Sequence, residues 1–189
     1  MQIINSSNDF IIVGENIHAT RIVLRNGKRS ITLNNGSEVV LFKDKNNKSH
    51  ELTIPESYKK RQPYKDGHIK HFMIAVEKAM TNDSKEVSEG SLYIESEILK
   101  QERKGAKYID LNIDEISHNK EIQIKAMEWL VTFSETIASV PLSIDSSNPE
   151  IIEAGLKKHN LKTSPMINSA ALERVDILDL VKKYKTKVI

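Results

Sequence analysis

Cysteine is absent from all 189 residues of the chain, which excludes disulfides, thiol nucleophiles and cysteine-ligated zinc or iron–sulfur centres. An excess of one charge is absent as well, because 28 Lys and Arg residues are balanced by 26 Asp and Glu residues, for a net charge of +2. Such a surface offers little attraction to nucleic acid or to an anionic membrane. We therefore expect neither as a partner.

Long apolar runs are missing too. No stretch approaches the ~20 apolar residues needed to span a bilayer, and residues 1–8 lack the basic-then-apolar order of a signal peptide. The first apolar run is followed by neither a glycine-rich loop with lysine nor the pattern G-x-G-x-x-G, so a nucleotide phosphate site is not expected. These absences indicate a soluble, cytoplasmic protein.

The apolar pattern that is present predicts alternating strands and helices. A first buried strand is expected at residues 10–14, and Gly105 stops a helix at residues 86–104. Further strands are expected at residues 108–112, 140–145 and 165–168, helices at 121–138, 150–158 and 172–184, and a last strand opens at 187–189. Short connections between such elements imply parallel strands with right-handed crossovers, which is an α/β fold.

Residues 21–80 interrupt this alternation after the first strand. Hairpin-like stretches at residues 21–33 and 39–54 predict a small β-meander, and apolar residues at helical spacing from Ile69 to Met80 predict a helix after it. Because the insertion follows the carboxyl end of a strand, we expect it to cap the mouth of the fold; shielding one edge is the alternative. His68 and His71 lack a third ligand nearby, so we expect a solvated helix face and no metal centre.

Polar residues mark the carboxyl ends of the expected strands. They are Glu15 and Asn16 after the first strand, Asp110 and Asn112 on the second, Asp145 on the third and Asn168 on the fourth. In a parallel sheet or barrel these ends share one face, where binding and catalytic groups gather. Any one of these residues alone is explained equally well as a helix cap or a turn residue.

Together the acids and amides favour one kind of ligand. Carboxylates only accept hydrogen bonds and amides both donate and accept, which suits a flat, neutral heterocycle with several N–H donors and a carbonyl. A phosphate would be repelled. A two-carboxylate metal or glycosidase site is the alternative, which the asparagines match less well.

Five ordered segments carry a resemblance to a known family. They are GAKYIDLN at 105–112, AMEWLV at 126–131, SIDSSN at 143–148, IEAGLKK at 152–158 and MINS at 166–169, with GE at 14–15 resembling the family's first strand. Together they resemble the pterin-binding family, and most closely its methyltetrahydrofolate:corrinoid (cobalamin) methyltransferases. These are relatives of the folate domain of cobalamin-dependent methionine synthase and, more distantly, of dihydropteroate synthase.

The resemblance implies a TIM (β/α)8 barrel, for which ~250 residues is typical. The chain is long enough for about the first four to five β/α units plus the insertion, so we expect residues 1–189 to be one barrel domain that is incomplete at its C-terminus. A piece of a longer enzyme is the preferred account, and a half barrel completed by a partner or by self-pairing as a homodimer is the alternative. The groups that activate the pterin would then lie beyond Ile189, which leaves the catalytic residues unassigned.

The resemblance also implies site roles and a reaction. Asp110, Asn112, Asp145 and Asn168 would hold the pterin, and a methyl group would move from 5-methyltetrahydrofolate to the cobalt of a corrinoid on a partner protein. The departing tertiary amine needs a proton or a hydrogen bond in the transition state. A dihydropteroate synthase-like condensation with p-aminobenzoate and a non-catalytic pterin-binding or assembly module are the alternatives.

Besides the insertion at residues 21–80, the sequence departs from the family pattern at two places. Ile113 and Asp114 stand where the family usually has valine and glycine, which adds a carboxylate at the expected pocket rim. Asn16 and His18 stand where it usually has arginine and asparagine. Asn16, His18 and Asp114 are therefore further candidates for the site, as is Glu15 at the end of the first strand.

Overall fold

The structure is a computed structural model that describes residues 10–160 and 163–189. Residues 1–8, which are not expected to form a signal peptide, lie outside this described part. Within it, no helix is long and apolar enough to cross a membrane.

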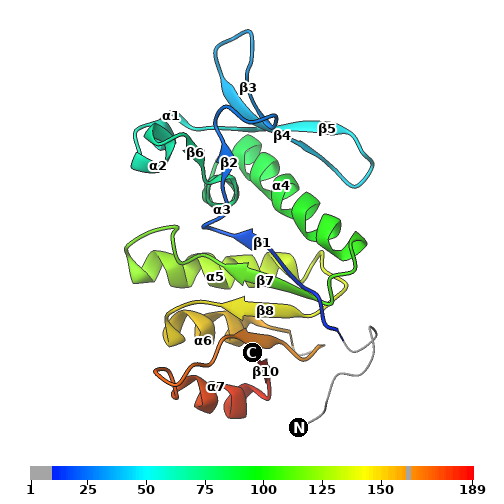
Figure 1. Cartoon of the computed structure of the whole chain (residues 1–189), viewed down its shortest axis with the longest axis vertical. Helices are drawn as coiled ribbons and strands as arrows, with labels where there is room; N and C mark the ends of the chain where they lie inside the picture. Colours follow the sequence, from blue (N-terminus) through cyan, green and yellow to red (C-terminus); the bar gives the residue numbers. More distant parts are fainter. Residues whose placement is uncertain (1–9, 161–162) are drawn as a thin grey trace.

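A five-stranded sheet forms the centre of the fold, with all its pairings parallel (Figure 1). Its strands are, in spatial order, β1 (Val13–His18), β7 (Tyr108–Asn112), β8 (Leu142–Asp145), β9 (Met166–Asn168) and β10 (Lys187–Val188). Each of these strands pairs with the next one along the chain in this sheet, so every right-handed crossover steps in the same direction and places its helix on the same face. This order is that of a β/α barrel, whereas a doubly wound sheet reverses direction at a switch point. The sheet is therefore consistent with part of an α/β barrel.

Three of the four crossover helices in the described part of the chain have a side-chain cap at their N-terminus, from Asp83, Asn119 and Asn148. The four helices are α4 (Ser84–Arg103), α5 (Lys120–Ser134), α6 (Pro149–Lys158) and α7 (Ile177–Tyr184). Asn148 caps α6 by accepting a hydrogen bond from the backbone N–H of Glu150, and Pro149 occupies the first turn. Gly105, with φ of +91°, follows the end of α4 in a conformation that favours glycine.

The register separates the two faces of the sheet. Ile109 is paired with Leu142 and Leu111 with Ile144, and all four side chains are buried in the hydrophobic core. Because side chains alternate along a strand, Asp110 and Ser143 lie on the opposite face, away from this apolar layer. One face of the sheet is therefore an ordinary core, while the other carries polar groups.

The structure corrects two expected boundaries. Residues 10–12 are not buried: Phe10, Ile11 and Ile12 are more than half exposed, and β1 starts at Val13, where its register with Tyr108 of β7 begins. At the other end of the chain, α7 starts only at Ile177, and Leu172 is 93% exposed. In both places an apolar sequence run extends beyond the neighbouring element that could bury it.

The insertion pairs differently from the sequence prediction. Strands β3 (Ser30–Thr32), β4 (Glu38–Lys43) and β5 (Ser49–Thr53) form an antiparallel meander, which confirms the hairpin at residues 39–54. The hairpin expected at residues 21–33 is wrong, because β2 (Val23–Leu24) pairs with β6 (His68–Ile69) instead. The insertion also contains α1 (Glu56–Lys59), α2 (Gln62–Lys65) and α3 (His71–Ala79).

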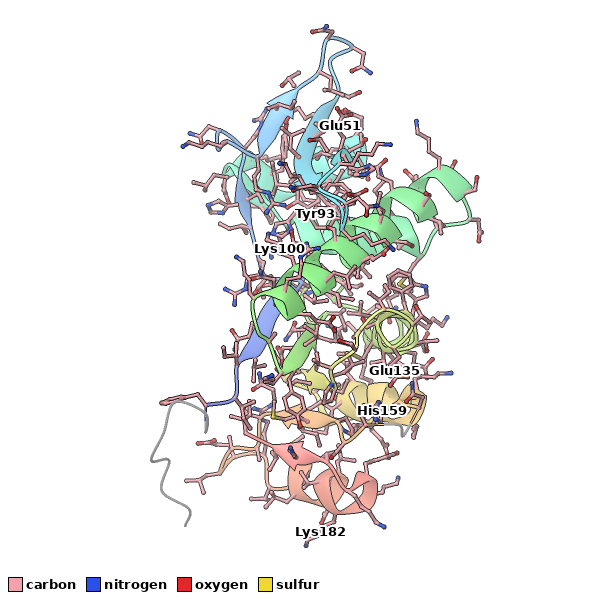
Figure 2. All side chains as sticks on the ribbon, turned by 90° about the vertical axis from the view of Figure 1, so that its right-hand side faces the viewer. Glu51, Tyr93, Lys100, Glu135, His159 and Lys182 are labelled. Carbon is pink, nitrogen blue, oxygen red and sulfur yellow. The ribbon has the colours of Figure 1, made fainter. Side chains whose placement is uncertain are left out.

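Tyr93 of α4, which is labelled in Figure 2, contacts residues of both the meander and α3. Its hydroxyl lies 2.7 Å from Nδ1 of His71 and accepts a hydrogen bond of 2.7 Å from Arg29, and its ring packs edge-on against Phe42 of β4. His71 is buried, so the expected solvated face for His68 and His71 is wrong for His71. Burial, with the charges of Arg29 and Lys100 adding to it, lowers the pKa of His71 to about 3.

The insertion lies beside β1 and also reaches the rim of the sheet's carboxyl end. Figure 1 shows the meander stacked beyond α4 along the long axis of the molecule. The segment before α3 lies closer to the rim, since Lys70 forms an ion pair of 2.5 Å with Glu115 in the loop after β7. A hollow of about 480 Å³ lies between this segment and that loop. The insertion thus adjoins the mouth on one side.

Candidate functional site

Strand register brings the predicted site residues together. Asn112 of β7 is paired with His18 of β1 on one side and with Asp145 of β8 on the other, and Asp145 is paired in turn with Asn168 of β9. Asp110 lies two residues before Asn112, so its side chain is on the same face. Four strands therefore contribute to one polar cluster at their carboxyl ends.

Hydrogen bonds fix the orientation of both amides in this cluster. Asn112 donates from Nδ2 to Oδ2 of Asp145 over 2.9 Å, while its Oδ1 accepts from the backbone N–H of Asp114 over 3.0 Å. Asn168 donates from Nδ2 to Oδ1 of Asp110 over 3.2 Å. Each carboxylate is thus held by an amide from a neighbouring or next-neighbouring strand.

Asp110 is the most deeply buried acid of the cluster. The residue has no exposed surface, and its Oδ2 has no hydrogen-bond partner among the residues that the structure describes. Burial, with the charge of Asp145 adding to it, raises the pKa of Asp110 to about 6, although the nearby Ser143 hydroxyl and the amide of Asn168, which bonds to Oδ1, oppose the rise. A buried, unpaired carboxylate oxygen is costly, and it is the kind of group that a ligand's donor satisfies.

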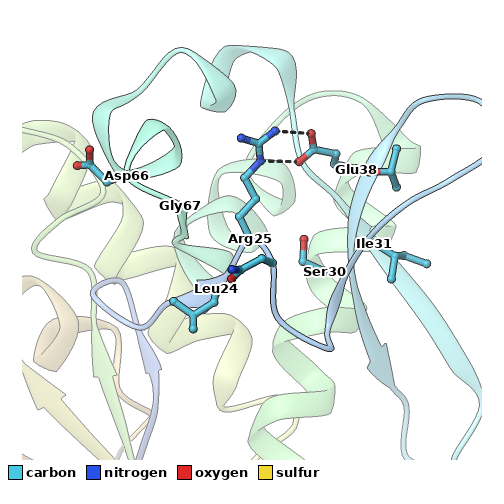
Figure 3. A pocket seen from close by; sticks show the side chains of 9 residues that line it. Leu24, Arg25, Ser30, Ile31, Glu38, Asp66 and Gly67 are labelled. Atoms are coloured by element: carbon cyan, nitrogen blue, oxygen red, sulfur yellow. Dashed lines mark hydrogen bonds and ion pairs between the residues drawn. The ribbon is translucent and has the colours of Figure 1, made fainter.

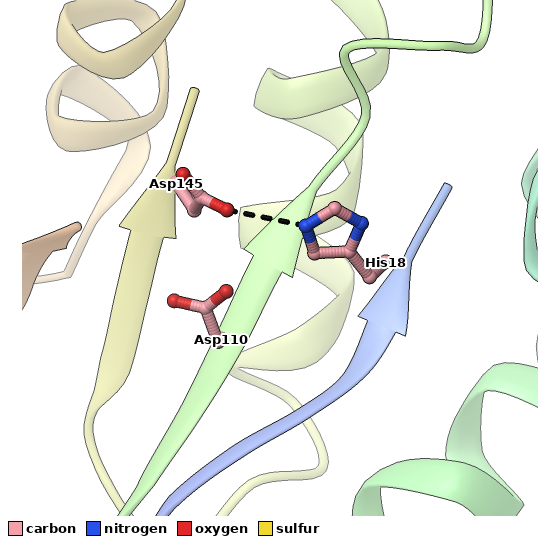
Figure 4. A group of neighbouring side chains, drawn as sticks. All are labelled: His18, Asp110 and Asp145. Atoms are coloured by element: carbon pink, nitrogen blue, oxygen red, sulfur yellow. Dashed lines mark ion pairs between the residues drawn. The ribbon is translucent and has the colours of Figure 1, made fainter. Parts of the chain in front are cut away.

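His18 reaches the cluster because β1 is irregular. Its register shifts between Gly14 and Ile17, so that two residues oppose Asp110 and the following His18 turns toward β8. Nε2 of His18 lies 3.2 Å from Oδ2 of Asp145 (Figure 4). The backbone N–H of Thr20 donates to Nδ1 of His18 over 3.3 Å, which favours the tautomer with the proton on Nε2, facing Asp145.

Glu15 and Asn16, by contrast, lie outside the hydrogen-bonded cluster. Both are exposed, and Glu15 accepts a hydrogen bond of 3.0 Å from Arg21. The backbone N–H of Asn16 donates to Oε1 of Gln101 on α4 over 2.8 Å. These two residues occupy the irregular part of β1, which turns them away from Asp110.

Asp114 lies at the rim of the site, and both of its carboxylate oxygens accept hydrogen bonds from the loop after β8. Its Oδ1 accepts a hydrogen bond of 2.5 Å from the Ser146 hydroxyl, and its Oδ2 accepts one of 2.8 Å from the backbone N–H of Ser147. Arg174 contacts the same loop from the following unit by donating to the carbonyl of Ser146 over 3.1 Å. The extra carboxylate therefore ties together the loops after β7 and β8.

Three further polar residues belong to the site, although the sequence did not single them out for it. Ser143 lies between Asp110 and Met166 in register, Thr20 contacts His18, and Arg174 braces the loop after β8. Alternation along β8 could have identified Ser143, because it precedes Asp145 by two positions. No sequence signal marks Thr20 or Arg174, because their roles depend on the tertiary fold.

The hollow in the insertion is separate from this cluster. It measures about 540 Å³ and is lined by residues of β2, β3, β4 and the turn at Asp66 and Gly67 (Figure 3). Arg25 spans one side of it with an ion pair of 3.1 Å to Glu38 and stacks on the Tyr64 ring. None of its lining residues belongs to the polar cluster.

Fold and cluster together define a class: part of an α/β barrel with acids and amides gathered at the carboxyl ends of its strands. A model of the family described as "Pterin binding enzyme" matches residues 82–189, a segment that includes Asp110, Asn112, Asp145 and Asn168. The chain belongs to this pterin-binding enzyme family, whose members are TIM barrels and generally transferases. The match does not include β1, so His18 lies outside it.

Proposed function

We propose that the chain binds a reduced pterin through Asp110, Asn112, Asp145 and Asn168, and that it takes part in methyl transfer from 5-methyltetrahydrofolate to a corrinoid carried by a partner protein. The observation that carries the binding proposal is the buried Asp110, whose Oδ2 has no hydrogen-bond partner in the described part of the chain. The family match supports the pterin as the ligand.

The donor and acceptor pattern suits the edge of a pterin ring. A pterin presents an amino group and a ring N–H beside ring nitrogens and a carbonyl, so it needs acceptors and donors side by side. Asp110 and Asp145 supply the acceptors, and the amide of Asn168 supplies both kinds of group. Asp145 is already held by Asn112 and His18, so it is oriented before the ligand arrives.

Methyl transfer is the step that the sequence resemblance favours. The C–N bond to the methyl group breaks, the reduced cobalt of the corrinoid receives the methyl group, and the pterin nitrogen leaves as an amine that takes up a proton. In this proposal the chain's own residues bind and orient the pterin ring. The proton donor is not assigned to any of the described residues.

The binding proposal is tested by calorimetry with 5-methyltetrahydrofolate on the full chain. Asp145→Ala removes a charged acceptor, and we expect binding to weaken by about 10- to 100-fold, since a hydrogen bond to a charged group contributes roughly 1.5–3 kcal/mol. Asp179→Ala removes an exposed carboxylate from α7 and should leave binding unchanged. Absence of binding by the unchanged chain would refute the proposal.

The reaction is tested separately, by following the visible absorption of a reduced corrinoid protein mixed with the chain and 5-methyltetrahydrofolate. Formation of the methylated corrinoid supports the methyltransferase. Incorporation of p-aminobenzoate into a dihydropterin would instead identify dihydropteroate synthase-like chemistry. Pterin binding without either reaction would identify a binding or assembly module.

A further inference from the structure

The polar cluster contains a set of donor atoms with the chemistry of metal ligands, two of which it shares with the proposed pterin site. One donor atom from each of His18, Asp110 and Asp145 lies within 4.8 Å of the others (Figure 4). The three residues come from three adjacent strands, β1, β7 and β8. Donors around a tetrahedral zinc ion lie about 3.4 Å apart, so modest side-chain rotations would bring all three onto one ion.

A second observation indicates that this cluster lacks a ligand. The side chain of Asp110 has no exposed surface, so water does not reach its Oδ2. This oxygen also has no hydrogen-bond partner among the described residues. His18 and Asp145 are about a fifth exposed, at 18% and 22% of their side-chain surface, so the cluster is open to solvent on one side. A cation would reach the cluster from that side and would compensate the buried charge.

The surroundings of His18 suit a metal ligand. A ligating histidine usually donates its other ring N–H to a nearby acceptor, which fixes the tautomer. The hydroxyl oxygen of Thr20 lies 2.6 Å from Nδ1 of His18, where it can accept that proton when Nε2 turns to a metal. In that state the backbone N–H of Thr20, which lies 3.3 Å from Nδ1, gives up its hydrogen bond to the ring. The same hydroxyl can donate to Nδ1 in the metal-free tautomer, so it serves either state.

We infer that His18, Asp110 and Asp145 form a binding site for a divalent transition-metal ion such as Zn²⁺. One imidazole and two carboxylates give mixed nitrogen and oxygen ligands, which suit zinc, iron(II) or manganese(II) better than an all-oxygen magnesium or calcium site. The two negative charges of the carboxylates balance the two positive charges of the ion. Three protein ligands leave a coordination position open toward solvent, as in catalytic rather than structural zinc sites.

This inference does not depend on the proposed function, although the two share Asp110 and Asp145. The metal site requires His18, which lies outside the family match, whereas the pterin proposal rests on β7, β8 and β9. If both hold, zinc and 5-methyltetrahydrofolate compete for the two carboxylates.

The test is equilibrium dialysis of the untagged full chain against Zn²⁺, with Co²⁺ as a spectroscopic probe. We expect one ion per chain and a visible d–d absorption of bound cobalt. His18→Asn should weaken binding by more than about 100-fold, since loss of an outer hydrogen bond alone costs 10- to 100-fold. Thr20→Val should weaken it by about 10-fold or more, and His118→Asn, which changes an exposed histidine in the loop after β7, should not.

Circular dichroism and the melting temperature show whether each variant folds. If His18→Asn does not fold, Thr20→Val, at an exposed position, still tests the site. Failure of the unchanged chain to bind zinc stoichiometrically would overturn the inference. Unaltered affinity in folded His18→Asn would overturn it as well. Zinc binding without 5-methyltetrahydrofolate binding refutes only the proposed function, and the reverse result refutes only the metal site.

Discussion

Nδ2 of Asn168 donates a hydrogen bond of 3.2 Å to Oδ1 of Asp110, a residue 58 positions earlier in the chain. The bond joins β9 to β7 across the intervening β8. It holds one oxygen of the buried carboxylate and leaves the other oxygen without a partner in the described structure. The ligand-binding capacity of the cluster therefore lies chiefly at Oδ2 of Asp110.

Asp110→Asn should stabilise the protein near neutral pH. A carboxyl whose folded pKa is raised to about 6 keeps its proton in the folded state while the unfolded chain has already lost it, so the free energy of unfolding falls as pH rises from about 4 to about 6. At about 1.36 kcal/mol per pKa unit, this loss amounts to at most roughly 3 kcal/mol. Urea unfolding at about pH 4.5 and pH 7.5 measures how much the free energy of unfolding of Asp110→Asn exceeds that of the wild type.

The gain should appear at the higher pH and largely vanish at the lower, where Asp110 is protonated in the folded protein. Asp179→Asn, at an exposed position, serves as the control and should show no such pH dependence. Equal differences between wild type and Asp110→Asn at both pH values would contradict the burial argument.

Gly90→Ala should destabilise the protein, although alanine is the better helix former. A Cβ at position 90 of α4 would meet the backbone carbonyl of Ala75 and lie 2.7 Å from the backbone nitrogen of Ala79, both on α3. The two helices would have to separate, at a cost that exceeds the propensity gain of about 1 kcal/mol. We expect a net loss of roughly 1–3 kcal/mol by chemical denaturation.

Ser88→Ala is the matched control in the same helix, because Ser88 is exposed. This change should be neutral or slightly stabilising. If Gly90→Ala proved as stable as Ser88→Ala, the close contact of α3 with α4 would be wrong.

Tyr93→Phe should cost about 1–3 kcal/mol, because it leaves Nδ1 of the buried His71 without its hydroxyl partner and removes an acceptor from Arg29. The control is Tyr184→Phe, whose lost hydroxyl lies 3.0 Å from Glu153 near the surface and which should cost less than about 1 kcal/mol. Thermal unfolding of both variants gives the comparison. Equal losses would show that the Tyr93 network does not hold the meander to α3.

Asp114→Ala should weaken 5-methyltetrahydrofolate binding only a few-fold, in contrast to Asp145→Ala. Both oxygens of Asp114 are occupied by Ser146 and Ser147, so its loss loosens the loops and removes no free acceptor. Calorimetry measures the binding, and hydrogen exchange should show faster exchange of the Ser147 amide. A loss as large as that of Asp145→Ala would identify Asp114 as a direct ligand.

Local patterns in the sequence predicted the order of strands and helices in the β/α part of the fold, but not all of their bounds. Residues 108–112 alternate apolar and polar side chains and are buried throughout, and Asn148 with Pro149 forms a helix start that depends only on nearby backbone groups. The helix expected at residues 172–184 is longer than α7, because apolar spacing does not reveal that Leu172 is exposed. Hydrophobic periodicity and capping residues identify a helix or strand, but burial against its neighbours decides where it begins and ends.

The sequence by itself determined the order of strands and helices and the polar residues at strand ends, because periodicity, capping and turn chemistry act over a few residues. Only the tertiary structure decided that β2 pairs with β6, that a bulge in β1 turns His18 toward Asp145, and that Asp110 is fully buried. These features depend on register between distant segments and on the layers packed around them. Neither is encoded in the spacing of residues along one segment.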